Sequence, residues 1–500
     1  MKINSWFLGI CFSVLALPLG AQNHMDVLRF SSKNGDGDAQ WIGTGGAMSA
    51  VGANPSATTN NPAGLGFYRQ TELGLSLGIF NQAINSTYFA SESSASRMGL
   101  YIPNISFVTS TLKKPLGKET DKDVIGYTFA FQHNRAHNFG AEMFYQGRNR
   151  QSSMLNAFYD ESEDLFSDEL GNREYLAYDV YLLNPDGSSQ TKYTIPLKEG
   201  DRNAVQSGNI VMRGGRNDYS ASGAFNYGNK LYVGANLFYS VQTYKEVNEY
   251  REDNELSLEG FKDMTYTTDL NARGVGYGAT IGIIFKPLES IRLGASIQLP
   301  TTYKFKDVFS ESMAASFDPR SSFVPPVLNP SSSIEDMRSE YSVLTPARYN
   351  FSMALVDGSF GFVNLEFENV DYSTSALSSE LFNTLVDNSK VRSEFRNVTS
   401  FRLGTELIND DMRFRFGLGY NPSPFNQNFI EYDNLRRQWI FSGGVGFVRD
   451  DFRFDVGISQ SRFKDTYIPY TTTDPEFPYS SVSSLFRATR LVATMVFVLK

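Results

Sequence analysis

Very few residues in this sequence have the types and spacing that catalysis requires. Residues 74–78, GLSLG, match the G-x-S-x-G pattern of serine hydrolases. That pattern needs a serine on a sharp turn between a strand and a helix, but Ser76 lies within an alternating apolar and polar run that no helix follows. A general base would have to be one of the three histidines, His24, His133 or His137, and nothing in the sequence places one near Ser76. We therefore expect no enzyme.

Metal and cofactor sites are equally weakly supported. His133 and His137 share one face if their strand is regular, which would suit a metal or a haem, but no third ligand accompanies them. The one cysteine, Cys11, lies in the N-terminal apolar segment, and no group of His, Cys, Asp and Glu has zinc spacing. Residues 43–46, GTGG, lack a P-loop lysine and the rest of a dinucleotide fingerprint. We expect no metal and no cofactor, and a polar lining role for the two histidines.

The N-terminus and the overall charge indicate an exported protein. Residues 1–21 have a positive start at Lys2, an apolar stretch at 7–17 and a small-residue cleavage site that ends at Ala21, as in a secretory signal peptide. Beyond residue 21 no apolar run reaches the roughly 20 residues of a spanning helix. The net charge of -9 argues against a nucleic-acid partner.

Alternation of apolar and polar residues dominates the chain after residue 70. Residues 452–459, FRFDVGIS, put Phe, Phe, Val and Ile on one face and Arg, Asp, Gly and Ser on the other. A period of two predicts strands with one apolar face, in a soluble sandwich as well as in a membrane barrel. We predict fourteen strands, at 71–90, 97–112, 122–149, 208–227, 230–250, 263–286, 291–309, 338–357, 359–374, 395–409, 411–420, 436–449, 451–464 and 486–499.

The connections favour the barrel. Tight turns at 228–229, 287–290, 357–358, 409–410 and 449–450 alternate with long polar loops at 150–207, 251–262, 310–337, 375–394, 421–435 and 465–485. An even number of strands, with short turns on one rim and long loops on the other, is typical of outer-membrane barrels. The even count requires 122–149 to be one strand with a kink at 133–138 rather than two strands. The sequence therefore predicts an all-β fold, a transmembrane antiparallel barrel of about 14 strands in the outer membrane of a Gram-negative bacterium.

A glycine-rich segment precedes the strands. Residues 43–67 are small and uncharged, cannot form a large core of their own, and suit close packing against other backbone. We expect residues 22–70 to fold as a plug inside the barrel of residues 71–500. The barrel's inward faces then carry a charged network of Arg292, Glu366, Arg413, Arg415, Arg453 and Asp455.

The sequence resembles the FadL-type family of outer-membrane transporters for long-chain fatty acids and other hydrophobic compounds. The resemblance rests on the small-residue run 45–53, GGAMSAVGA, followed by NNPAGL at 60–65, and on weaker matches at 344–346 and 370–373. It implies an N-terminal hatch in the barrel lumen and a kinked third strand that opens the wall. Carried over residue by residue, the hatch comprises Gly45, Gly46, Ala47, Asn60, Asn61, Pro62, Ala63 and Gly64, and the lateral opening comprises His133, Asn134, Arg135, His137 and Asn138.

The expected function follows from that resemblance. Family members capture a hydrophobic ligand among the extracellular loops, move it past a rearranging hatch, and release it sideways into the membrane. We expect a monomeric channel for passive uptake of fatty acid-like compounds, with membrane lipid as its surroundings. The alternatives are an outer-membrane scaffold or secretion-associated barrel, and a haemin receptor. The chain departs from common barrels by ending on Leu499-Lys500 instead of an aromatic residue.

Overall fold

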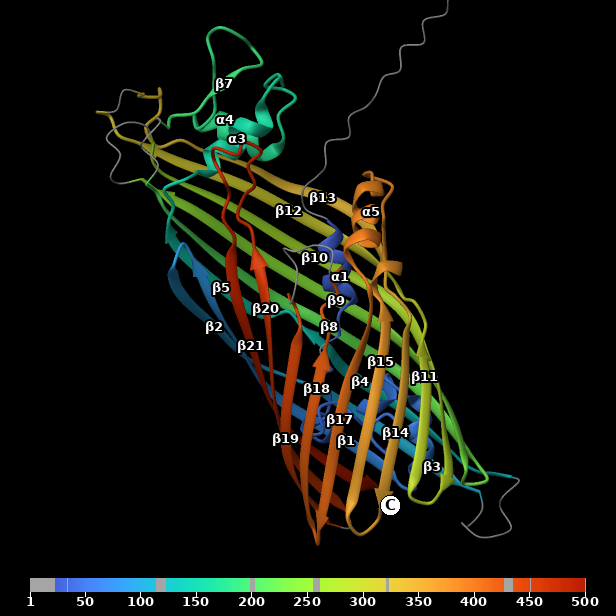
Figure 1. The fold of residues 1–500 in the computed structure, drawn as a ribbon. Coiled ribbons are helices and arrows are strands. Elements are labelled where there is room, and N and C mark those ends of the chain that lie inside the picture. Colours follow the sequence, from blue (N-terminus) through green and yellow to red (C-terminus); the bar gives the residue numbers. More distant parts are fainter. Residues whose placement is uncertain are drawn as a thin grey trace, which may run out of the picture.

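The protein is a strand-rich barrel with few and short helices (Figure 1). The computed structural model describes residues 23–33, 35–113, 123–197, 203–254, 261–320, 323–426, 435–449 and 451–499. The expected signal peptide therefore lies outside the described residues. Among the described residues, no helix is long and apolar enough to cross a membrane.

The barrel wall begins at Thr71 and ends at Leu499. Both ends lie on one rim, here called the lower rim, and the long loops lie on the upper rim (Figure 1). The wall strands are β1 (Thr71–Tyr88), β2 (Ser91–Tyr101), β3 (Asn104–Leu112), β4 (Val124–Asn138), β5 (Ala141–Arg148), β8 (Val205–Tyr227), β9 (Leu231–Asp253), β10 (Phe261–Leu288), β11 (Ile291–Gln298), β12 (Thr302–Phe317), β13 (Ser331–Leu344), β14 (Arg348–Asp357), β15 (Gly361–Asp371), β17 (Asn397–Asn409), β18 (Met412–Asn421), β19 (Gln438–Arg449), β20 (Phe452–Tyr467) and β21 (Val482–Leu499).

The lower half of the wall is a closed ring of fourteen antiparallel strands. Its order is β1, β3, β4, β8, β9, β10, β11, β14, β15, β17, β18, β19, β20 and β21, and β21 pairs back with β1. The prediction of fourteen strands is confirmed. Closure satisfies the backbone groups that a free sheet edge would leave unpaired.

Four of the fourteen predicted strands are each broken into two. Three breaks fall at Pro103, Pro300 and Pro346, between β2 and β3, β11 and β12, and β13 and β14. Proline has no N–H for the ladder and so ends or bends a strand. The fourth break, between β4 and β5, falls at Phe139 and Gly140.

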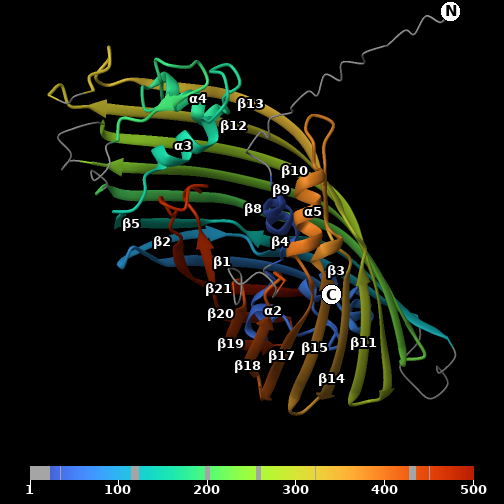
Figure 2. The same ribbon diagram turned by 45° about the horizontal axis from the view of Figure 1, so that its top comes forward.

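The breaks divide the upper half of the wall. Above them β2 pairs with β1 and β5 pairs with β8, and β2 contacts β5 without a hydrogen-bonded ladder between them. On the opposite side of the barrel, β12 and β13 change direction relative to β11 and β14. The sheet β8–β9–β10–β12–β13 therefore extends well above the lower ring (Figures 1 and 2).

Two predicted connections were wrong. The first strand pair is joined at the upper rim by the tight turn Phe89 and Ala90, because β2 begins at Ser91 and not near residue 97. The predicted loop 310–337 is mostly a hairpin, since β12 runs to Phe317 and β13 starts at Ser331. The expected tight turns at 228–229, 287–290, 357–358 and 409–410 are confirmed on the lower rim.

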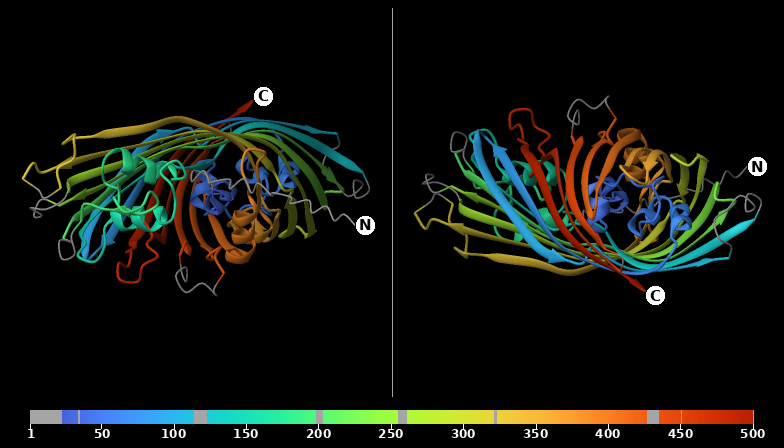
Figure 3. Two further views of the ribbon diagram at one scale, coloured as in Figure 1. Left: turned by 90° about the horizontal axis from the view of Figure 1, so that it is seen from above. Right: turned by 90° about the horizontal axis from the view of Figure 1, so that it is seen from below.

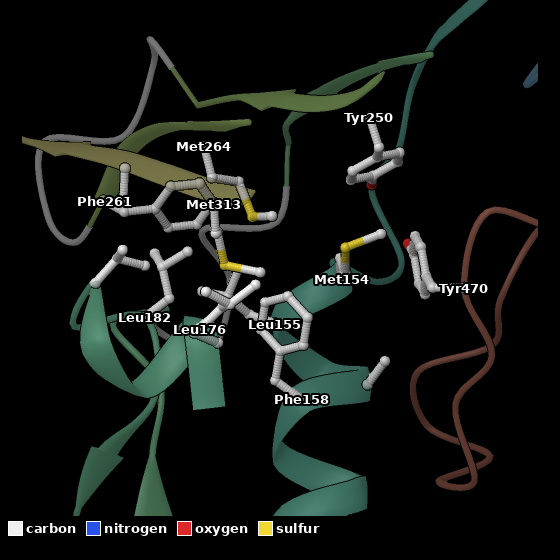
Figure 4. Close-up of a cluster of buried hydrophobic side chains, with 14 of the residues drawn as sticks. Met154, Leu155, Phe158, Leu176, Leu182, Tyr250, Phe261, Met264, Met313 and Tyr470 are labelled. Carbon is white, nitrogen blue, oxygen red and sulfur yellow. The ribbon is translucent and has the colours of Figure 1, made fainter. Parts of the chain in front are cut away.

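The upper rim carries folded loops. They contain α3 (Met154–Ser162), α4 (Asn172–Asp179), the short strands β6 (Asn184–Pro185), β7 (Tyr193–Thr194) and β16 (Ala376–Ser378), the 3-10 turn η4 (Tyr372–Thr374) and α5 (Leu385–Glu394). Leu155 and Phe158 of α3 pack with Leu176 of α4 against Met264 and Met313 of the wall (Figure 4). This packing holds the long loop as a cap over the strands β8, β9, β10 and β12.

The segment before the wall lies inside the ring (Figure 3). It contains α1 (His24–Ser31), α2 (Ala39–Gly43) and the 3-10 turns η1 (Ser56–Thr59) and η2 (Pro62–Phe67). The helix α2 contacts β18 to β21, η2 contacts β4, β8, β9 and β10, and α1 contacts α5, β13 and β16. The segment thus crosses the lumen from the lower strands up to the loops.

Candidate functional site

The small residues of the N-terminal segment permit close backbone contact with the wall. Gly45 and Gly46 adopt φ of +65° and +78°, in the left-handed region that favours glycine. The wall has glycines at the facing positions: a Cβ on Gly404 would lie 2.6 Å from the Thr44 carbonyl oxygen, and one on Gly444 would lie 3.3 Å from the Gly43 Cα. Ala47 is fully buried at this contact. Larger side chains on either surface would push the segment off the wall.

The Asn-Pro-Ala-Gly stretch is fixed on the opposite side of the lumen. The Asn61 side chain accepts from the Ala63 backbone N–H at 3.1 Å, which caps η2, and donates to the Ile283 carbonyl at 3.2 Å. Asn60 donates to a Glu366 carboxylate oxygen at 3.0 Å. Pro62 and Ala63 are buried against the wall glycine Gly234, on which a Cβ would lie 2.5 Å from the Pro62 carbonyl carbon, and Gly64 packs against Gly52 of the same segment.

Buried charges of the wall hold the segment in place. Arg415 donates to Glu406 at 2.6 Å and to Asp455 at 2.7 Å, and Gln40 of α2 donates to Glu406 at 3.0 Å. Glu366, which is fully buried, also accepts from the Ser49 backbone N–H at 3.2 Å. Because buried carboxylates need partners, the segment and the wall satisfy one another's polar groups. The predicted inward network of charges is confirmed for these residues.

The break in the third strand lies one step beyond the predicted kink. The strand β4 continues through His133, Asn134, Arg135, His137 and Asn138 and stops before Phe139. A register shift between Arg135 and His137 marks a bulge in the ladder with β8. The Arg135 guanidinium donates to the Gly214 carbonyl at 2.8 Å and to Asn217 at 3.1 Å, which ties the bulge to β8.

The prediction that His133 and His137 share a face was wrong. One residue of the bulge is left out of the ladder, so the side chains after it change sides. His133 lines an outward groove beside Phe131 and Tyr219, whereas His137 lines an inward cavity beside Phe139. The two imidazoles therefore lie on opposite sides of the wall and do not form one ligand pair. No group of three metal-ligating side chains occurs within the part of the chain that the structure describes.

The inward cavity is amphipathic. Its volume is about 290 Å³, and Phe139 and Gly140 of the strand break are among its lining residues. One part of its lining is apolar, and includes Leu28, Phe139, Met212, Val398, Phe463 and Phe486; the other part carries the cations Arg29, Lys33, Arg348, Arg402 and Arg436 with the carboxylates Glu368 and Asp465. A cavity of this size is at the lower end of the range for small-molecule sites, on the order of 300 Å³.

Lys33 differs from the other cations of this cavity. Arg348 pairs with Glu368 at 3.3 Å and Arg436 pairs with Asp465 at 3.0 Å. Lys33 has no ion-pair partner among the described residues and donates only to the Gln298 side chain. Burial, together with the nearby positive charge of Arg348, lowers the pKa of Lys33 to about 7. Lys33 thus offers a proton-dependent positive charge to whatever enters.

An apolar groove lies on the outer side of the same strand. It has a volume of about 840 Å³ and is lined by side chains of β1, β3, β4, β8, β9 and β10, among them Leu73, Phe107, Phe131, Leu237 and Tyr277, with His133 at one edge. The outer groove extends along β4 to His133, six residues before Phe139, whereas the inner cavity is lined by residues of the break itself. The two hollows lie on opposite sides of the wall.

Sequence reasoning placed the strand interruption correctly to within a few residues but did not find the cavity. The cations that line it come from the N-terminal segment, β14, β17 and the loop before β19. No short motif joins them. The prolines at three of the four wall breaks are visible in the sequence and could have predicted where those strands end.

Solved structures of known proteins share this fold. The chain is similar to a Pseudomonas aeruginosa FadL homologue (TM-score 0.54, 12% identity, covering 94% of this chain and 99% of that one). It is also similar to the Pseudomonas putida toluene transporter TodX (TM-score 0.52, 14% identity, 93% and 99%) and the Ralstonia pickettii toluene transporter TbuX (TM-score 0.50, 14% identity, 93% and 99%). No family model and no curated protein matches the sequence. The protein thus has the fold of the FadL-type barrels over almost its whole length, which confirms the resemblance at the level of fold.

Proposed function

We propose that the protein is an outer-membrane channel for passive uptake of hydrophobic compounds, with the segment 22–70 as its hatch. The observation that carries the proposal is the pairing of an amphipathic cavity and an outer apolar groove on the two sides of one broken strand. The fold shared with two toluene transporters supports it. The long-loop rim then faces outward from the cell and the lower rim faces the periplasm.

The lining of the cavity favours an amphiphile with an anionic head, such as a long-chain fatty acid. A neutral aromatic hydrocarbon cannot form an ion pair with Lys33, and burying a charge without a partner is unfavourable. A carboxylate near Lys33 would supply the missing partner, while an alkyl chain would lie along Phe463 and Phe486 towards Phe139. The cations thereby orient the apolar end of the ligand towards the break in the wall.

In this mechanism the ligand leaves sideways. The hatch residues Asn61, Pro62 and Ala63 occupy the lumen below the cavity, so a straight path to the periplasm is closed. From Phe139 and Gly140, the ligand crosses the wall between β2 and β5, which share no hydrogen-bonded ladder, and then reaches the outer groove. An apolar chain avoids water on that route, which lowers the barrier relative to a wet pore.

The test is uptake of radiolabelled oleate and toluene by cells that lack the protein, cells that carry it, and cells that carry Asn61→Gly, Pro62→Ser and Ala63→Gly together. We expect oleate to enter only with the intact protein, and equally well after the proton gradient is collapsed. Ser359→Ala, in an exposed lower turn, serves as the matched control at equal surface expression. Uptake that requires inner-membrane energy would refute the passive mechanism.

A non-transporting scaffold is the second candidate. The observation that favours it is an apolar patch at the upper rim, formed by Leu381, Leu385 and Val386, which are 61%, 71% and 66% exposed. Exposed apolar patches often mark protein contacts. If neither oleate nor toluene distinguishes the cells, and a protein partner co-purifies with the barrel but is lost from Leu385→Ser, the scaffold replaces the channel.

A further inference from the structure

The outer face of the wall changes character at one level. Tyr219, Tyr239 and Tyr277 lie side by side in register on β8, β9 and β10, and the Tyr239 and Tyr277 rings are 5.0 Å apart between centroids. Below this row the outward residues are apolar, such as Ile281 and Phe285 on β10. A tyrosine row at the edge of an apolar band is the usual mark of a membrane–water interface.

Above the tyrosine row the same face becomes cationic. On β10, Arg273 lies four residues before Tyr277 in the sequence and therefore closer to the upper rim. Lys306 lies directly opposite Arg273 on β12. The exposed cations on the outer face of these strands include Arg213, Lys245, Arg273, Lys304 and Lys306. The nearby acids neutralise two of them, since Lys245 pairs with Asp269 at 3.0 Å and Lys306 with Glu340 at 2.6 Å. Within the described parts of the chain, Arg273 and Lys304 have no ion-pair partner.

Three of these cations share a groove on the outer surface. The groove has a volume of about 950 Å³ and is lined by Arg273, Lys304 and Lys306, together with Val275 at its lower side. The segment 378–381 borders it, because β16 adds to the edge of β13 with Ser378 opposite Ser342. Glu340 and Glu380 also line it, so the groove retains one net positive charge, in a chain whose net charge is -9.

We propose that this groove, here called the basic groove, binds the phosphate-bearing headgroup of a lipid in the leaflet on the long-loop side. The inference rests on the proposed placement of the barrel in a membrane, and not on its transport activity. Phosphate oxygens accept from Arg273, Lys304 and Lys306, the hydroxyls of Ser342 and Ser378 donate to further headgroup oxygens, and the acyl chains lie over Val275 and Tyr277.

The level of the groove fits this occupant. A cation on the outer face of a barrel is costly at the middle of the bilayer, by about 2–4 kcal/mol, and nearly neutral at its edge. Unpaired Arg273 and Lys304 therefore belong at the depth of the headgroups, which is where phosphate is found. A free soluble anion would not need the apolar surface of Val275, which lines the groove, and of Tyr277, which follows two residues further down the strand.

The test is native mass spectrometry of the delipidated barrel titrated with a doubly phosphorylated disaccharide glycolipid, its dephosphorylated counterpart, phosphatidylglycerol and inorganic phosphate. The test variant carries Arg273→Gln, Lys304→Gln and Lys306→Gln. The matched control carries Arg462→Gln, Lys464→Gln and Arg487→Gln, which removes the same charge from exposed outward positions on β20 and β21. Circular dichroism verifies that both variants fold.

We expect the wild type to bind the phosphorylated glycolipid. The test variant should bind it at least about tenfold more weakly, because each of the three cations near an anionic headgroup contributes to the affinity. The control should stay within about twofold of wild type on the same basis. Equal loss in the control, equal binding of the dephosphorylated glycolipid, or displacement of the lipid by inorganic phosphate would each overturn the proposal. Phosphatidylglycerol binding that depends on the same three cations supports it and widens the lipid class.

Oleate uptake by the same variants separates this inference from the proposed function. Normal uptake by the test variant together with lost lipid binding leaves both proposals standing. If the wild type transports nothing and still binds the phosphorylated lipid through the basic groove, the transport proposal fails alone.

Discussion

At the scale of single residues, Lys33 is the cation of the inward cavity whose protonation depends most directly on the charge of a bound ligand. Its ammonium group is buried near Arg348 and Arg216, with Glu368 and Asp218 as the nearby carboxylates. Its lowered pKa of about 7 means that the charged form dominates below pH 7 and the neutral form above it. A bound anion stabilises the charged form, so binding of the anion takes up a proton.

We therefore predict that affinity for an amphiphile of fixed charge, decanesulfonate, falls as the pH rises from 6 to 8. The slope is at most about tenfold per pH unit, because one proton is linked to binding. Lys33→Gln should bind more weakly at pH 6 and show a flat profile, measured by isothermal titration calorimetry in detergent. A pH dependence that survives in Lys33→Gln would assign the proton to another group.

At the scale of elements, the break between β4 and β5 is the feature that the proposed transport route needs. It consists of Phe139 and Gly140, and β4 and β5 pair with the same strand, β8, on either side of it. Deleting these two residues joins the strands without changing which side chains face inward, because strands have a period of two. Since Asn138 lies opposite Gly215 and Ala141 opposite Met212, the joined strand pairs with β8 after β5 has slipped by two residues along it.

We predict that the deletion leaves a folded barrel and lowers oleate uptake by tenfold or more, on the order of what closing the only exit would give. Pro346→Ala, which relaxes a different break, is the control and should transport normally. Heat-dependent migration on gels reports folding of each barrel. Undiminished uptake by a folded deletion variant would show that the ligand does not leave through the break between β4 and β5.

The strands themselves show how far sequence reasoning reaches. Alternation such as that of residues 452–459, together with the short turns, predicted the number of strands, because period two and turn chemistry are local properties. It did not predict that β2 begins at Ser91 and β13 at Ser331. The bulge before His137 was not foreseen, since a register shift depends on the partner strand β8. The cavity was not foreseen either, because Lys33, Phe139 and Phe463 come together only when β21 closes onto β1.

At the scale of the whole molecule, the barrel and the segment inside it have separable supports. The closed ring satisfies its own backbone, and the segment is held by side-chain contacts such as those of Gln40 with Glu406 and Asn60 with Glu366. Without the segment, the buried carboxylates and Arg415 would face a water-filled lumen, where they are solvated instead of stranded. The ring is therefore expected to fold without the N-terminal segment.

We predict that a chain lacking residues 23–69 forms a folded barrel that conducts ions in planar bilayers, whereas the full-length protein does not open a steady pore. A ring of this many strands encloses a lumen wide enough for water once its contents are removed. The carboxylates Glu366, Glu406 and Asp455 are balanced there by Arg402, Arg415 and Arg453 of the wall. Removing one negative charge by Glu366→Gln should therefore shift the ion selectivity of the pore towards anions. A truncated barrel that folds but does not conduct would mean that wall side chains close the lumen by themselves. The role of the N-terminal segment would then be to hold the ligand and not to block the pore.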